Sequence, residues 1–99
     1  MKGKPQYVYQ VLLITKLRNR AYSSEEVGIT LDLELAKNKL KDAWNDATKC
    51  YARQIELEGY EKIVEESQNK CSVTFKYING GIFDEDLYQK IFIREIEIK

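Results

Sequence analysis

The sequence predicts an α+β fold of order ββαβββ, in which one long amphipathic helix packs on an antiparallel sheet. Apolar residues recur at helical spacing from Leu33 to Leu57, with charged residues opposite them. Elsewhere, short runs rich in β-branched and aromatic residues are separated by turn residues, as is typical of strands. Because 99 residues suffice for one hydrophobic core but not two, we expect a single domain over residues 1–99.

The first two strands are expected to form a hairpin. The first is predicted at Tyr7–Arg18, where both alternating sets of side chains are largely apolar. This pattern places the strand at the sheet centre, covered on both faces for part of its length. After a polar loop, alternation of Val27, Ile29 and Leu31 predicts the second strand.

The helix follows directly. Asp32 or Thr30 is its predicted N-cap, and Gly59 its predicted stop. One side of its apolar arc carries only alanines, which would let the sheet, or a second helix in a homodimer, approach closely. The arc consists of Leu33, Ala36, Leu40, Ala43, Trp44, Ala47, Cys50, Tyr51 and Ile55.

Residues 60–67 fit either a further helical turn or a strand, and the turn residues on both sides favour the strand. The next strand is predicted at Cys71–Ile78, with Val73, Phe75 and Tyr77 on one face. Asn79-Gly80-Gly81 then predicts a turn, because these residues tolerate positive φ.

The last strand is predicted at Tyr88–Lys99. Its apolar alternation changes parity across Arg94-Glu95. That change predicts either a β-bulge at this point or apolar cover on both faces.

Composition argues against an enzyme. The chain has no histidine, which removes the usual general base and the commonest zinc ligand. Its five glycines form no nucleotide-binding signature. Cys50 and Cys71 are too few for a secreted disulfide framework, and buried thiols or one internal bridge both fit. No cofactor and no metal ion are therefore expected.

Charge is unevenly distributed in a chain of zero net charge. Residues 1–50 hold nine basic and six acidic residues, and residues 51–99 hold seven and ten. Such a dipolar chain suits a partner of complementary charge. The candidate protein-binding residues are acidic or aromatic: Glu56, Glu58, Glu61, Glu65, Glu66, Asp84, Glu85, Asp86, Tyr60 and Tyr88.

The three adjacent acids Asp84-Glu85-Asp86 are expected on a connection. Hard cations such as Ca²⁺ prefer oxygen ligands, but the triplet lacks the spaced ligands and the glycine of a calcium loop. A solvated acidic loop is therefore expected rather than a metal site.

An alternative site is basic. Lys16, Arg18 and Arg20 recur with period two and are followed by Tyr22. Cations for phosphates and a ring for base stacking are what nucleic-acid binding requires. The zero net charge argues against this alternative, and protection of a sheet edge by the same cations is the simpler interpretation.

No apolar run is long enough to cross a bilayer, and the basic N-terminus is not followed by the apolar stretch of a signal peptide. The sequence alone thus predicts a cytoplasmic protein, without a membrane partner.

The runs ITLDLELAKNKLKDAW, GYEKIVEE and IFIREIEIK together resemble short accessory proteins of bacteriophages, archaeal viruses and other mobile elements. The resemblance spans most of the chain and rests on structural elements rather than on a diagnostic motif. It implies a non-enzymatic protein that binds a host protein or complex, in the manner of anti-CRISPR inhibitors of host defence. For a viral protein, the location would be the host cytoplasm.

Overall fold

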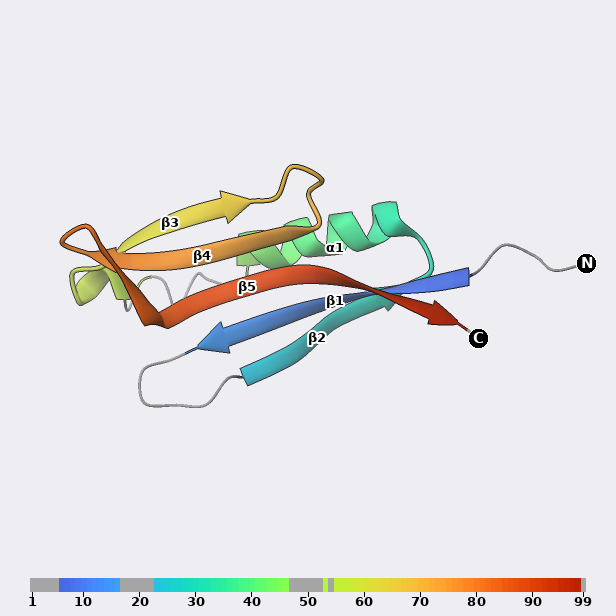
Figure 1. Ribbon diagram of the computed structural model, residues 1–99, viewed down its shortest axis with the longest axis horizontal. Helices are drawn as coiled ribbons and strands as arrows, with labels where there is room; N and C mark the ends of the chain where they lie inside the picture. Colours follow the sequence, from blue (N-terminus) through green and yellow to red (C-terminus); the bar gives the residue numbers. More distant parts are fainter. Residues whose placement is uncertain (1–5, 17–22, 47–52, 54, 99) are drawn as a thin grey trace, which may run out of the picture.

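A computed structural model of the protein describes residues 6–16, 23–46, 53 and 55–98. Within these residues, five antiparallel strands form one sheet in the order β2-β1-β5-β4-β3 (Figure 1). The central strand is β5, so the prediction that the first strand lies at the centre is wrong. The strands are β1 (Gln6–Lys16), β2 (Ser23–Thr30), β3 (Glu61–Glu66), β4 (Ser72–Asn79) and β5 (Ile82–Ile98).

The predicted fold class, ββαβββ with one long helix, is wrong. Helix α1 (Leu33–Asp46) has 14 residues, and helical conformation appears again in a separate short segment at residues 55–57. The described chain is therefore mostly antiparallel sheet, with one helix and a short helical piece. Apolar periodicity indicates which side of a helix is buried, but it does not by itself set the bounds of the helix.

Asp32 explains where α1 begins, and Gly59 explains where the short helical segment ends. Asp32 caps α1, because its Oδ1 accepts the Glu34 backbone N–H at 2.8 Å. Gly59, the predicted helix stop, has φ of 95° and ends the short helical segment. The Gly59 N–H donates to the Glu56 carbonyl and the Tyr60 N–H to the Ile55 carbonyl. This pair of bonds is a Schellman motif, for which glycine is the favoured residue.

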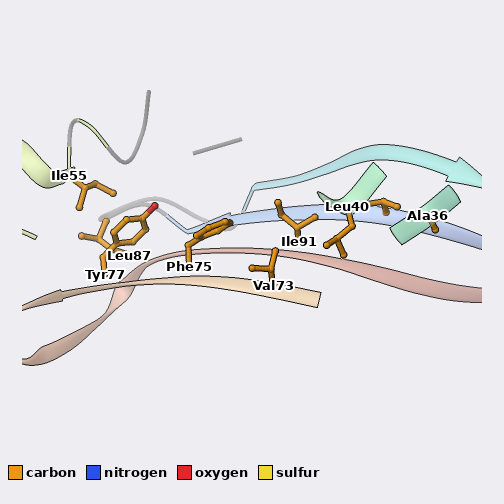
Figure 2. Close-up of a cluster of buried hydrophobic side chains, with 9 residues drawn as sticks. Ala36, Leu40, Ile55, Val73, Phe75, Tyr77, Leu87 and Ile91 are labelled. Carbon is orange, nitrogen blue, oxygen red and sulfur yellow. The ribbon is translucent and has the colours of Figure 1, made fainter. Parts of the chain in front are cut away.

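The core lies between α1, the short helical segment and one face of the sheet (Figure 2). Val73, Phe75 and Tyr77 are buried on one face of β4, as the sequence predicted. The Tyr77 hydroxyl donates to Gln89 Oε1 at 3.3 Å, which satisfies a polar group inside the core. The buried cluster is Val11, Ala36, Leu40, Ile55, Val73, Phe75, Tyr77, Leu87 and Ile91.

Residues 60–67 are confirmed as a strand over the range of β3, which pairs with β4. The Asn79-Gly80-Gly81 turn is also confirmed, with positive φ at Gly80 and Gly81. It joins β4 directly to Ile82, the first residue of β5. The acids at 84–86 therefore lie within a strand, and their predicted place on a connection is wrong.

A large bulge in β5 was not predicted. Lys76 pairs with Tyr88, whereas Ile78 pairs with Phe83. Residues 84–87 of β5 thus lie opposite Tyr77 alone, and β5 bends sharply there (Figure 1). Of the two alternatives predicted at Arg94-Glu95, the bulge is absent from the described pairing, because β1 and β5 keep one register from Gln6↔Ile98 to Lys16↔Tyr88.

Candidate functional site

The bulge of β5 brings two predicted site residues together. The Tyr60 hydroxyl donates a hydrogen bond of 3.0 Å to Asp84 Oδ2, and both residues are partly buried. The backbone of Tyr60 is also held in place, because its N–H donates to the Ile55 carbonyl in the Schellman motif. The two side chains border an open hollow of about 420 Å³, which is lined by Tyr60, Asn79, Ile82, Phe83, Asp84 and Glu85.

Sequence reasoning did not find Phe83 and Ile82, although both line this hollow. Ile82 is 74% exposed and Phe83 is 38% exposed, so the acids have apolar neighbours at the surface. The Lys76 Nζ lies 5.4 Å from the centre of the Phe83 ring. The Gly80-Gly81 turn could have indicated these two residues, because they follow it directly and therefore lie at the end of the sheet.

Strand β3 forms the acidic edge of the sheet. It pairs with β4 on one side, and no described strand pairs with its other side. All six of its residues are exposed, including Ile63 and Val64 at 40% each. Glu65 binds Lys76 at 2.9 Å, and Lys62 lies over the Phe75 ring at 5.4 Å.

The remaining acids are distributed around that edge. Glu56 belongs to the short helical segment and Glu58 to the turn after it, and both are exposed. Glu85 is exposed in the bulge, whereas the side chain of Asp86 lies outside the described part of the structure. We use the name acidic edge for β3 together with Glu56, Glu58, Asp84 and Glu85.

Two predicted residues lie away from the middle of this edge. Glu66, at the end of β3, borders a second hollow of about 430 Å³ beside α1, with Trp44 and Lys70 among its other lining residues. Tyr88 lies opposite Lys16 of β1 and Lys76 of β4. The strand pairing therefore places Tyr88 between Lys16, a residue of the alternative basic site, and Lys76.

The alternative basic site can be placed only at Lys16, the last residue of β1, because Arg18, Arg20 and Tyr22 lie outside the described residues. Of the two predicted partners for the alanine side, the sheet is confirmed at Ala36, which is completely buried in the core, and a second helix is excluded there. Ala43 packs against the same core, and Ala47 is not among the described residues.

The described residues contain no group of three or more acids or cysteines placed to hold a metal ion. Cys71 is a free, half-buried thiol, and Cys50 lies outside the described residues. Neither helical piece that the structure describes is long and apolar enough to cross a membrane.

No protein-family model, curated protein or solved structure matches this chain. The geometry of its surface is therefore the basis for a functional proposal. Among the predicted sites, the acidic edge combines described acids, exposed apolar side chains and an unpaired strand side.

Proposed function

We propose that this chain is a non-enzymatic binding protein that acts in the cytoplasm by docking a basic segment of a partner protein along its acidic edge. The observation that carries the proposal is the exposed side of β3. No described strand pairs with it, and its six residues are all exposed.

An unpaired strand side offers backbone N–H and C=O groups to an incoming extended segment. Backbone hydrogen bonds of this kind give affinity, and the side chains on either side of the strand select the sequence that binds. Here those side chains include Glu61, Glu65 and Glu66, together with the apolar Ile63 and Val64. A segment that alternates lysine or arginine with apolar residues complements them.

The hollow beside Tyr60 and Asp84 extends the same edge. Its lining mixes the exposed Ile82 and Phe83 with the carboxylates of Asp84 and Glu85. An arginine side chain suits such a lining, because its stem packs on apolar atoms while its guanidinium pairs with a carboxylate.

The resemblance to viral and mobile-element accessory proteins supports a host protein or complex as the partner, with inhibition of host defence as the outcome. The bound chain would block a surface of its partner by steric hindrance and by charge pairing, without catalysing a reaction. Mutual attraction of opposite charges would speed association and weaken as salt is added.

The test is affinity capture from a host lysate at low and high salt, with the wild-type chain and two variants as bait. The triple variant E58K/E61K/E66K reverses three charges on the acidic edge, and D42K reverses one charge on the exposed side of α1 as a control. We expect proteins captured by the wild type to be retained by D42K and lost by the triple variant. Equal capture by all three baits, or no salt-sensitive capture, would contradict the proposal.

A further inference from the structure

The turn that joins β3 to β4 extends beside α1 (Figure 1), and the two border the hollow of about 430 Å³, here called the Trp44 hollow. Glu66, the last residue of β3, pairs with Val73, which is buried on the side of the sheet that α1 covers. Because paired residues of an antiparallel sheet point to the same side, Glu66 faces α1 across this hollow. Among the residues of the acidic edge, Glu66 alone belongs to the described lining.

The α1 side of the hollow offers an apolar and aromatic surface. Leu40 is 2% exposed and belongs to the core, yet it also borders the hollow. Trp44, four residues further along α1, is half-buried, because it packs against the core while it lines the hollow. An indole held in this way keeps one orientation and presents the rest of its ring system to the hollow. Such a surface suits a flat ring, which can stack on it.

The rim of the hollow is rich in cations. Lys37 and Lys41 lie on the same side of α1 as Trp44, because successive members of this set are three or four residues apart. Lys70 lines the hollow from the turn after β3. Lys37 is paired with Glu34 at 3.6 Å. Within the described residues, neither Lys41 nor Lys70 forms an ion pair, so both are available to an anion.

The turn holds the backbone of Lys70 in a defined place. Its φ of 59° is uncommon for a residue other than glycine. The Lys70 N–H donates to the Ser67 carbonyl at 3.0 Å. The Ser67 hydroxyl accepts the backbone N–H groups of Cys71 and Ser72, each at 3.0 Å. A ligand therefore has to order only the side chain of Lys70, and this lowers the entropy cost of binding.

Glu66 weakens the positive field of the hollow without cancelling it. Once Lys37 and Glu34 are counted as a pair, Lys41 and Lys70 face one carboxylate. The charge of the lining therefore favours an anion over a cation. The volume is at the lower end of the range found for small-molecule sites, about 300–1,000 Å³. It suits a molecule with one ring system and one anionic group.

We propose that the Trp44 hollow binds a small anion that carries a flat ring, with the ring on Trp44 and the anionic group between Lys41 and Lys70. Nucleoside monophosphates and aromatic carboxylates share this chemistry. The proposal goes beyond the docking of a basic segment at the acidic edge, and it requires a ligand of the opposite charge.

The first test uses the fluorescence of Trp44, the single tryptophan of the chain. The wild type is titrated with adenosine monophosphate and with benzoate, and adenosine and inorganic phosphate supply the ring alone and the anion alone. We expect a saturable change with at least one ring-bearing anion, at a dissociation constant below about 1 mM. Adenosine and phosphate should each bind at least about tenfold more weakly. The tighter of the two anions identifies phosphate or carboxylate as the preferred group.

Variants measured by isothermal titration calorimetry assign the binding to this hollow. W44L removes the ring and should lose about tenfold in affinity, whereas W44F keeps a ring and should lose less. K41Q/K70N removes both available cations and should also lose about tenfold, and asparagine tolerates the positive φ at position 70. K39Q is the matched control, because the Lys39 side chain lies beside Gly28 of β2 and does not line the hollow. It should bind within about twofold of the wild type.

E66K separates this proposal from docking at the acidic edge. It adds a cation to the hollow and should raise the affinity for the ring-bearing anion by about threefold, whereas the same change should weaken the binding of a basic segment. Circular dichroism of each variant shows whether it is folded. The proposal is wrong if the folded wild type binds neither ring-bearing anion, or if adenosine or phosphate binds as tightly. It is equally wrong if W44L and K41Q/K70N bind like K39Q.

Discussion

The Tyr60 hydroxyl donates to Asp84 Oδ2 across 24 residues of sequence, at a distance of 3.0 Å. Tyr60 follows the short helical segment, and Asp84 opens the bulge of β5. The bond therefore connects the residue after the short helical segment to the bulge, where the described pairing of β4 and β5 is interrupted. Because a charged acceptor strengthens a hydrogen bond, this contact holds the bulge in place at the acidic edge.

The variant Y60F tests that role. Removing the hydroxyl should lower the free energy of unfolding by about 1–2 kcal/mol, because the carboxylate loses a donor. D84N keeps an acceptor oxygen and should cost less. Urea denaturation of both variants measures the difference, and a neutral Y60F would show that the bond does not stabilise the fold.

Substitution of Gly59 tests the Schellman motif. G59A should destabilise the protein by roughly 1–2 kcal/mol, because alanine is strained at the φ of 95° found there. G59N is the comparison, since asparagine tolerates this conformation better. Thermal melts should therefore rank the wild type above G59N, and G59N above G59A. Equal melting of the two variants would contradict the strain explanation.

The N-cap of α1 can be tested at Asp32. D32A removes the acceptor of the Glu34 N–H and should cost about 1 kcal/mol. D42A is the control, because Asp42 is exposed within the same helix and alanine favours helix there. Chemical denaturation should show a lower midpoint for D32A and no decrease for D42A.

The packing of α1 on the sheet predicts a sharp contrast between two leucines. Leu40 is 2% exposed in the core, whereas Leu35 is 52% exposed on the same helix. L40A should cost about 2–5 kcal/mol, because it leaves a cavity. L35A should stay within about 0.5 kcal/mol of the wild type. Similar losses in both variants would mean that α1 packs through a different side.

Local sequence was enough to predict several elements. Alternation of Val73, Phe75 and Tyr77 gave the buried side of β4, and two adjacent glycines gave the turn after Asn79. Asp32 was one of two predicted caps for α1 and is the one whose side chain accepts from Glu34. Each of these features depends on residues close together in the chain.

Features that depend on distant partners were not predictable. The bulge at residues 84–87 arises from the register between β4 and β5, which no alternation within β5 reveals. The Tyr60–Asp84 contact then depends on that bulge.

The position of β5 has a consequence for how the chain folds during synthesis. β1 and β2 form one hairpin and β3 and β4 another, but the strand between them is made after both. Until β5 leaves the ribosome, each hairpin has an unsatisfied strand side, and isolated hairpins are marginally stable. Pairing of Gln6–Lys16 with the distant stretch 88–98 then closes the sheet. We expect slow, late and cooperative folding, with aggregation or chaperone capture of nascent chains that stop short of β5.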